Sequence, residues 1–457
     1  MGNSFKIETL SPVHIGSGNT FKPMDIGEYG HGRYIYIFDL DKVIERIPEH
    51  SIDKFSELII NFGDKNKNKY KDMGQMLLEA FGIDYEQWEN ISLYKVKKKD
   101  PGSIHDIYEE IKYGDRVYIP GSSIKGAIRT AIVYSFLKKE GYKFYLKKTG
   151  KIKYLCMVKP NNEEVEGIYK GNIDLSKIEA EIKKDMLMDD ATRDVFKCLH
   201  ISDSFPIPAE NCLEVRKIYV ANTTSFVKQR GSRKISMHPL FVECIRSGEV
   251  FSGLKIKVND KAIEALSEVY SNRKHTFEKI VELIKNWRSC LIEFTKDLIN
   301  AEKSFWRNNR NDIKANIIST YGKSPHSYIT KEFKIEDLIK NLEDIEQSGQ
   351  VLVRIGKYSG YLTHSVGLLI AKGLSETSYN LASFGKILSI YNHDNLFPLT
   401  RRLTLDNQTL GWCRLVESGD NESEDFEYAE HNKSEQKQNL NSSNIKEAFK
   451  SKGWRIS

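Results

Sequence analysis

A long apolar seam in the second half of the chain constrains its fold more than any other feature. Seven large apolar side chains recur there in steps of three and four: Phe277, Ile280, Ile284, Trp287, Leu291, Phe294 and Leu298. This heptad spacing predicts a helix that packs along its whole length against another helix. Because three heptads are the minimum for a coiled coil between chains, we expect a helical subdomain within one chain, over residues 259–345.

The composition describes a globular chain that can bind a polyanion. Its 457 residues suffice for two or three domains, and the net charge of +6 permits such a partner without requiring one. No run approaches the roughly 18 apolar residues of a membrane-spanning helix, and the N-terminus lacks a signal-peptide pattern, so we predict a cytoplasmic protein. The six cysteines form no C-x-x-C pair, and no Asp/Glu/His cluster has ligand spacing. We therefore expect neither a metal ion nor another cofactor.

The first of three glycine-rich segments follows a strand predicted for residues 5–10. It contains His14, Gly16, Ser17 and Gly18. Small residues leave backbone N–H groups and hydroxyls accessible to phosphate oxygens. We therefore predict that the segment binds RNA phosphates, with His14 stacked on a base or donating to a phosphate. A hairpin turn would need the same glycines, so this segment alone does not separate the two interpretations.

The second segment opens a helix that we expect over residues 123–139. Ser122 or Ser123 is a suitable N-cap. The free N–H groups of the first turn, together with the helix dipole, make such a helix end an anion site. The P-loop pattern G-x-x-x-x-G-K-[ST] is absent, so we exclude nucleotide hydrolysis.

The same helix carries positive charge one turn further on. Lys125 and Arg129 are four residues apart, so they share one face. Gly126 is intrinsically costly inside a helix, which predicts that a partner approaches closely there.

The third segment combines cationic and aromatic side chains around two glycines. Its members are Arg354, Gly356, Lys357, Tyr358, Gly360, Tyr361 and His364. Single-stranded RNA needs charge for its phosphates and flat faces for its bases, so this mixture favours RNA binding. We expect Tyr358 to be the better stacking residue. A structural turn would explain the glycines but not the clustered cations and rings.

Two further segments are defined by composition. Residues 228–234 hold four cations, and we expect a mobile basic loop that contacts RNA through Arg230, Arg233 and Lys234. A solvated charged surface remains the alternative there. Residues 417–446 are nearly free of apolar side chains, so we expect a disordered acidic linker, followed by a short tail at 447–457.

The three glycine-rich segments resemble motifs of one protein family. The runs P-V-H-I-G-S-G, P-G-S-S-I-K-G-A-I-R and R-I-G-K-Y-S-G-Y, in this order, resemble the RAMP superfamily of CRISPR proteins. The runs L-H-I-S-D-S at 199–204 and G-W-C-R-L at 411–415 are most similar to one branch of it, the fifth-subunit family of the type III-A Csm effector complex. The resemblance spans about residues 5–416.

The resemblance implies an α+β fold with an RRM-like or ferredoxin-like core. This core would occupy residues 1–258, with insertions at 48–115 and 141–200. A second ferredoxin-like domain would be completed by residues 346–416, after the helical subdomain.

The resemblance also implies a function in RNA binding. Members of this family cap the 3′ region of the guide RNA (crRNA) and support its maturation, with host nucleases recruited for that step. The implied partners are guide RNA, target RNA and the other Csm subunits. The family's backbone contacts correspond here to Ser122, Ser123, Lys125, Arg129 and the loop 354–361. Base pairing then recognises the sequence, while the protein reads backbone and shape.

A ribonuclease is the alternative function. A related subunit of such complexes cuts target RNA with an acidic residue that follows its glycine loop, and Asp25 falls near this place. Its flanks depart from that subunit's pattern, so we expect a buried or capping aspartate. His14, His200, His238 and His364 could supply acid–base chemistry, but no spacing forces two of them together. We therefore predict a non-catalytic protein.

Overall fold

The computed structural model divides the chain into two compact units, Met1–Glu417 and Ser418–Ser457. It describes residues 3–64, 69–149, 152–168, 176–188, 190–222, 239–322, 328–349, 351–370 and 400–418. Apart from Ser418, all of these belong to the first unit. The predicted acidic linker and tail therefore lie almost entirely outside the described residues. The described helices include none that is long and apolar enough to cross a membrane.

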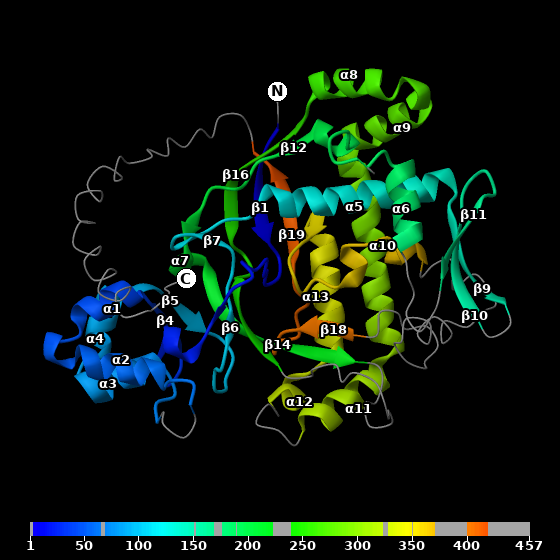
Figure 1. The fold of residues 1–457 in the computed structure, drawn as a ribbon. Helices are drawn as coiled ribbons and strands as arrows, with labels where there is room; N and C mark the ends of the chain where they lie inside the picture. Colours follow the sequence, from blue (N-terminus) through cyan, green and yellow to red (C-terminus); the bar gives the residue numbers. More distant parts are fainter. Residues whose placement is uncertain are drawn as a thin grey trace. The chain divides into compact units, whose positions relative to one another are not determined.

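One sheet brings together strands from both ends of the first unit. Its five antiparallel strands lie in the order β12 (Leu199–Ile201), β16 (Val250–Val258), β1 (Asn3–Thr9), β19 (Trp412–Glu417) and β17 (Leu352–Arg354). Figure 1 shows β1 between β16 and β19. Side chains alternate along β1, so Phe5 and Ile7 point into the core. Two of the strands within residues 346–417, β17 and β19, thus belong to the same sheet as β1.

A second sheet has eight strands. Seven follow the order β2 (Thr20–Phe21), β6 (Ile107–Tyr108), β15 (Leu240–Ile245), β14 (Leu213–Asn222), β5 (Ser92–Lys98), β4 (Tyr34–Phe38) and β3 (Ile26–Tyr29), and β18 (Thr400–Leu403) pairs with β14. The composition of residues 51–115 predicts polar helices, with the lysines of 95–99 in solvent; β5 shows that this prediction was wrong for residues 92–98. Burial alternates along β5, as in a strand with one covered face. Even Lys98, expected in solvent, is buried and paired with Glu28.

Four short helices cover one end of the second sheet: α1 (Leu40–Arg46), α2 (Ile52–Ile60), α3 (Met73–Phe81) and α4 (Tyr85–Ile91), seen in blue in Figure 1. They build a small core of their own around Trp88, whose ring meets the edges of Tyr36 and Phe38 at centroid distances of 5.6 and 5.5 Å. Helices are therefore present in residues 51–115 as predicted, but they bury more apolar side chains than the composition suggested.

The remaining elements form two small sheets and several helices. One small sheet consists of β7 (Lys112–Tyr113), β8 (Arg116–Val117) and β13 (Ile207–Pro208), and the other of β9 (Lys143–Thr149), β10 (Ile152–Val158) and β11 (Glu164–Ile168). The further helices are α5 (Gly121–Glu140), α6 (Ser176–Asp185), α7 (Ala209–Cys212), α8 (Asp260–Val269), α9 (Lys274–Lys285), α10 (Trp287–Asn308), α11 (Arg310–Tyr321), α12 (Tyr328–Glu332) and α13 (Ile335–Gln347). The mixed α and β composition agrees with the predicted fold class.

The apolar seam is buried within this chain. All seven of its side chains are buried, and the helix that carries them is broken at Asn286 into α9 and α10. Both halves pack on α5, and α10 also contacts α13. Tyr134 of α5 meets the ring of Phe294 at 5.3 Å. The interpretation of the seam as intramolecular helix packing is thus confirmed.

Three backbone segments meet beyond the end of β1. The Gly411 N–H donates to the Pro12 carbonyl at 2.9 Å, and the Gly411 carbonyl accepts from the Ile355 N–H at 2.8 Å. The Lys357 N–H donates to the His14 carbonyl at 2.7 Å. Gly411 has a φ of +93°, and a Cβ there would lie 2.1 Å from the Ile355 oxygen. This junction needs glycine because the chains approach too closely for a side chain.

We predict that Gly411→Ala destabilises the first unit strongly. Gly248 is the matched control, because its φ of +89° is similar and a Cβ there would meet nothing within 4 Å. Gly248→Ala should cost only the left-handed strain of about 1–2 kcal/mol, and Gly411→Ala about 1–3 kcal/mol more from the clash. Denaturant unfolding measures both. Equal losses would show that the junction tolerates a side chain.

Candidate nucleic-acid interface

His14 is a core residue, so the prediction that it touches RNA was wrong. Its side chain is 1% exposed. The Nδ1–H donates to the Glu243 carbonyl at 2.7 Å, and Glu110 Oε2 lies 3.3 Å from the same nitrogen. The ring stacks on Tyr358 with centroids 5.3 Å apart and planes 13° apart. Stacking on a base and donation of a hydrogen bond to a phosphate both need an exposed imidazole ring, which His14 lacks.

Backbone N–H groups of the first glycine-rich segment already donate hydrogen bonds to other residues of the chain. The Ile15 N–H donates to both carboxylate oxygens of Glu110 at 3.0 and 3.1 Å. The Ser17 N–H donates to the Glu109 carbonyl at 3.0 Å, and the Ser17 hydroxyl to the Glu109 carboxylate at 2.7 Å. These carboxylates fill the places predicted for phosphates and would repel them. Of the predicted contacts, Ser17 and Gly18 are exposed, and Gly16 is half-buried against His14.

Glu110 and Glu243 are fully buried and fix this loop to the second sheet. Glu243 accepts from the Tyr94 hydroxyl at 2.8 Å, from the Glu110 N–H at 3.0 Å and from Lys112 Nζ at 2.6 Å. Burial, reinforced by Glu243, raises the pKa of the Tyr94 phenol, which therefore stays a donor. The loop is held to the second sheet by the hydrogen bonds and the ion pair of these buried residues.

The second segment opens a helix as predicted, but its capping differs. α5 begins at Gly121, and its N-cap is Pro120, without a side-chain cap. Ser122 and Ser123 therefore lie inside the first turn. The Gly121 N–H donates to the Asp203 carboxylate at 2.7 Å. The anion site predicted at this helix end exists, and it holds a carboxylate of the chain itself.

The following turn of α5 presents an open polar face. Ser122 and Gly126 are exposed, and a Cβ on Gly126 would meet nothing within 4 Å. No ion pair is recorded for Lys125 within the described residues, and burial lowers the pKa of its ammonium. Arg129, by contrast, is paired with Asp194 at 3.1 Å and lies 5.2 Å from the centroid of the Phe196 ring. Of the two cations on this face, Lys125 therefore has the weaker interactions with the rest of the chain.

In the third segment, Arg354 is a structural residue and not an RNA contact. Its side chain is 3% exposed, and its Nε–H donates to the Leu410 carbonyl at 2.9 Å. The guanidinium lies 5.0 Å from the Trp412 ring centroid and 3.8 Å from a Glu302 oxygen. Burial lowers its pKa, and Glu302 offsets part of that cost. The arginine therefore ties β17 to α10.

The rest of this loop divides into an internal and an outer part. Gly356 must be glycine, because a Cβ there would lie 2.5 Å from the His14 carbonyl oxygen. His364 Nε2 lies 2.7 Å from the Ser359 hydroxyl and 3.1 Å from the Gly356 carbonyl, and burial lowers its pKa. Although part of His364 is exposed, its hydrogen bonds close the loop. Lys357, Gly360 and Tyr361 form the outer part.

One face of the Tyr358 ring already lies on His14, so less of this ring is open to a base than predicted. Burial raises its pKa to about 12. Tyr361 is 40% exposed and stands next to the exposed Gly360. It packs partly over Gly367, and it is the stronger candidate for contact with a base.

Sequence reasoning missed two residues that join this group. Lys357 Nζ lies 5.2 Å from the centroid of the Tyr108 ring, and the Arg402 guanidinium lies 5.6 Å from that of Tyr358. Arg402 Nη1 is buried without a hydrogen-bond partner among the described residues. Two adjacent arginines in β18 were the only sequence signal, and strand pairing alone brings them here. The predicted contacts Arg230, Arg233 and Lys234, and His238, lie outside the described residues.

The three segments are partly brought together. The first and third touch directly through His14, Gly356 and Tyr358. α5 contacts β17, the strand that leads into the third segment. Lys125 of α5 and Lys357 of the loop are thus carried by adjoining elements.

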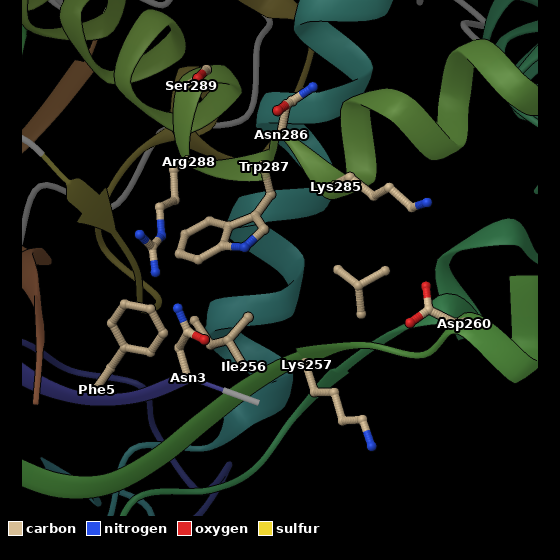
Figure 2. A pocket seen from close by; sticks show the side chains of 11 residues that line it. Asn3, Phe5, Ile256, Lys257, Asp260, Lys285, Asn286, Trp287, Arg288 and Ser289 are labelled. Atoms are coloured by element: carbon tan, nitrogen blue, oxygen red, sulfur yellow. The ribbon is translucent and has the colours of Figure 1, made fainter. Parts of the chain in front are cut away.

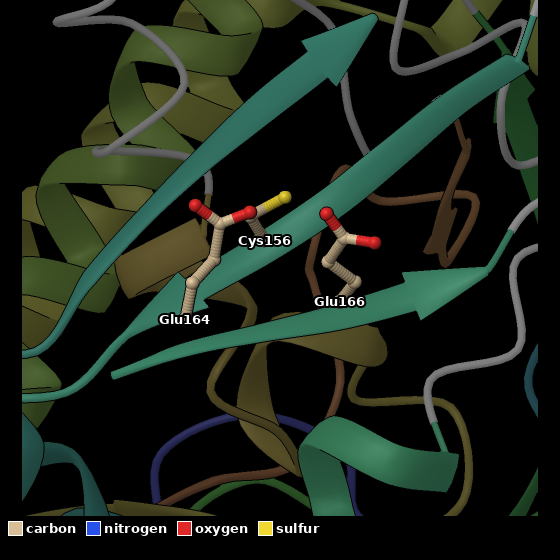
Figure 3. A group of neighbouring side chains, drawn as sticks. All are labelled: Cys156, Glu164 and Glu166. Atoms are coloured by element: carbon tan, nitrogen blue, oxygen red, sulfur yellow. The ribbon is translucent and has the colours of Figure 1, made fainter. Parts of the chain in front are cut away.

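One group of side chains in the described part of the chain could hold a metal ion. Cys156, Glu164 and Glu166 have ligand atoms within 4.8 Å of one another (Figure 3). They meet because β10 pairs with β11, with Cys156 opposite Glu166, so spacing along the sequence gave no sign of them. None of the predicted RNA contacts belongs to this group.

A pocket of about 490 Å³ lies beside the break between α9 and α10. Figure 2 shows Trp287 at its centre, with Arg288 and Phe5 on one side and Lys257, Lys285 and Asp260 on the other. Arg288 is paired with Glu417 at 3.0 Å. Two carboxylates, Asp260 and Glu417, offset two of the three cations, so the pocket keeps only a small net positive charge for a phosphate.

The chain belongs to the RAMP superfamily, whose family model matches residues 6–356. It is similar to a Methanocaldococcus jannaschii protein named CRISPR system Cms protein Csm5, with 24% identity over 444 residues, 90% of this chain and 88% of that protein. Its fold matches a chain of a cryo-EM structure of a type III-A Csm–crRNA–target RNA ternary complex, with a TM-score of 0.54 and 20% identity over 91% of this chain and all of that one. The crystal structure of T. onnurineus Csm5 matches with a TM-score of 0.53 and 20% identity over 90% and 99% of the two chains. The family resemblance of the sequence motifs is thereby confirmed.

We predict that the two tyrosines of the third segment respond differently to alanine. Tyr358→Ala removes the ring that covers His14 and should lower the free energy of unfolding by about 2 kcal/mol. Tyr361→Ala should cost about 1 kcal/mol or less, because its side chain is more exposed. Tyr358→Phe is the control, since it keeps the stacked ring. Thermal unfolding gives the ranking, and a larger loss for Tyr361 would reverse the assignment.

Proposed function

We propose that this protein is a subunit of a type III-A CRISPR ribonucleoprotein that binds the guide RNA without cutting it. The observation that carries the proposal is Gly126. This residue lies in the interior of a 20-residue helix, exposed, with open space where a Cβ would be. Glycine there costs the helix about 1 kcal/mol relative to alanine, and no internal contact of the described chain requires it. Close approach of an RNA backbone beside Lys125 supplies the missing reason.

The likeness to Csm5 proteins supports the rest of the proposal. The match extends over about nine tenths of both chains, and one fold neighbour comes from a complex with crRNA and target RNA. From the family resemblance we also propose that the protein binds the 3′ region of the guide RNA and supports its maturation together with host nucleases. We further propose that it contacts target RNA and other Csm subunits. Lys125, Gly126, Ser122, Lys357 and Tyr361 are the described residues that we propose to touch RNA.

The ribonuclease alternative is disfavoured by the contacts of its candidate residues. The Asp25 carboxylate accepts from the Lys22 N–H at 2.7 Å, and the Asp25 N–H donates to the Lys22 carbonyl at 2.8 Å, at the start of the 3-10 helix Pro23–Asp25. Burial raises the pKa of its carboxyl. His14 is buried, and the Nε2 of His364 lies in hydrogen bonds within its own loop. Each of these groups has a structural role that explains its presence.

The Gly126 assignment predicts opposite effects of one substitution on stability and on binding. Gly126→Ala should raise the free energy of unfolding by about 0.5–1 kcal/mol, because the new methyl group meets no neighbour. The same methyl group should weaken guide-RNA binding several-fold, because it fills the space that the backbone needs. Unfolding and RNA-binding titrations on the same variant measure the two. Increased stability with unchanged affinity would remove the central support of the proposal.

Lys125→Ala should weaken RNA binding and lower the slope of log K against log salt by about 0.7, the value for one phosphate contact of single-stranded RNA. Lys139→Ala is the matched control, because this exposed lysine lies near the other end of α5. Equal slopes for both variants would mean that only net charge matters.

Incubation of the protein with guide precursor, with and without Mg²⁺, should give no specific cleavage. Cleavage that disappears in Asp25→Asn, a variant that keeps the capping acceptor, would instead establish the ribonuclease.

A further inference from the structure

The run Ser202-Asp203-Ser204 follows β12 and fixes the start of α5. The Ser202 hydroxyl accepts from the Lys255 N–H of β16 at 2.9 Å. The Ser204 hydroxyl accepts from the Ile119 N–H, just before the helix, at 2.8 Å. Between them, Asp203 accepts from the Gly121 N–H at 2.7 Å. Each side chain of the run therefore holds a different part of the surrounding backbone.

The helix start lies directly on the backbone of this run. A Cβ on Gly121 would lie 2.5 Å from the carbonyl oxygens of both Ile201 and Ser202. Gly121 is therefore required by packing within the protein, in contrast to Gly126, which faces open space. The two glycines of this helix are therefore explained differently, and only Gly126 has open space beside it for a ligand.

Asp203 also places a negative charge at the positive end of the helix dipole. The first turn of α5 contains no acidic residue of its own, so the charge comes from a segment 82 residues away. Asp203 is exposed, so its charge is felt by anything that approaches the helix start. A phosphate there would meet a carboxylate already bound to the Gly121 amide.

We infer that Asp203 is a specificity-determining residue of the RNA site: its carboxylate takes the place of a phosphate at the start of α5 and directs the RNA backbone to Lys125 and Gly126, one turn further on. This inference rests on the proposed function. It explains why a helix start that looks like a phosphate site is sealed by packing and charge, while the next turn is open.

The test is Asp203→Asn, which keeps an oxygen acceptor for the Gly121 N–H and removes only the charge. It should bind a single-stranded guide RNA about two- to five-fold more tightly at low salt, as expected for the loss of one nearby like charge. The gain should shrink as salt screens the charge. Asp84→Asn is the matched control. Asp84 is the N-cap of α4, and its carboxylate accepts from the Glu86 N–H at 3.1 Å. This substitution changes net charge equally and should leave affinity unchanged.

Asp203→Ala separates charge from positioning. It should lower the melting temperature by removing the acceptor, whereas Asp203→Asn should not. Unchanged or weaker RNA binding by Asp203→Asn, in a protein in which Lys125→Ala still weakens binding, would overturn the inference and leave the proposed function intact. An equal gain in Asp84→Asn would overturn it as well. Absence of any Lys125→Ala effect would defeat the proposed function, and the inference with it.

Discussion

The junction beyond β1 is the constraint on which the rest of the structure depends. There the loop after β1, the loop after β17 and the turn before β19 exchange backbone hydrogen bonds through Pro12, His14, Ile355 and Gly411. The contact joins residues some 400 positions apart, since the Trp412 N–H also donates to the Ser11 hydroxyl at 3.0 Å. It sets β19 beside β1 and presents the loop 356–361 at the surface. The glycines of this region serve close packing of chain on chain.

A second theme is that carboxylates of the protein occupy the places where phosphates were expected. The Glu110 carboxylate accepts from the Ile15 N–H, and the Asp203 carboxylate accepts from the first N–H of α5. Glu109 accepts from the Ser17 hydroxyl through its carboxylate and from the Ser17 N–H through its backbone carbonyl. In each case an N–H group that could have met a ligand is satisfied at 2.7–3.1 Å from within. In the proposed function, RNA is therefore contacted by partly or fully exposed groups instead of these backbone amides, namely at Lys125 with Gly126 and at Lys357 with Tyr361.

Local patterns in the sequence were sufficient for some of this structure. The presence of α5 and the burial of the apolar seam follow from periodicity and glycine placement, although α5 begins at Gly121, two residues earlier than predicted. The role of Asp25 as a capping residue could also be predicted, since its partner is three residues away. These features depend on neighbours along the chain, which a sequence displays directly.

The errors concern contacts between distant segments. His14 and Arg354 look like ligand-binding residues. Glu110 and Glu243 instead hold His14 in the core, and Glu302 lies beside the buried Arg354. Asp203 caps a helix that begins far before it in the sequence, and Arg402 reaches Tyr358 only through the pairing of β18 with β14. No spacing rule reveals such pairs, because strand register and helix packing create them.

Amide hydrogen exchange of the protein, free and bound to guide RNA, tests the central claim most directly. RNA should slow amide exchange in the second turn of α5, around Lys125 and Gly126, and in residues 357–361. The amides of Ile15, Ser17 and Gly121 should be unaffected, because their hydrogen bonds to Glu110, Glu109 and Asp203 are already made. New protection of these three amides, with none around Gly126, would mean that phosphates displace their acceptors within the chain and that the account is wrong.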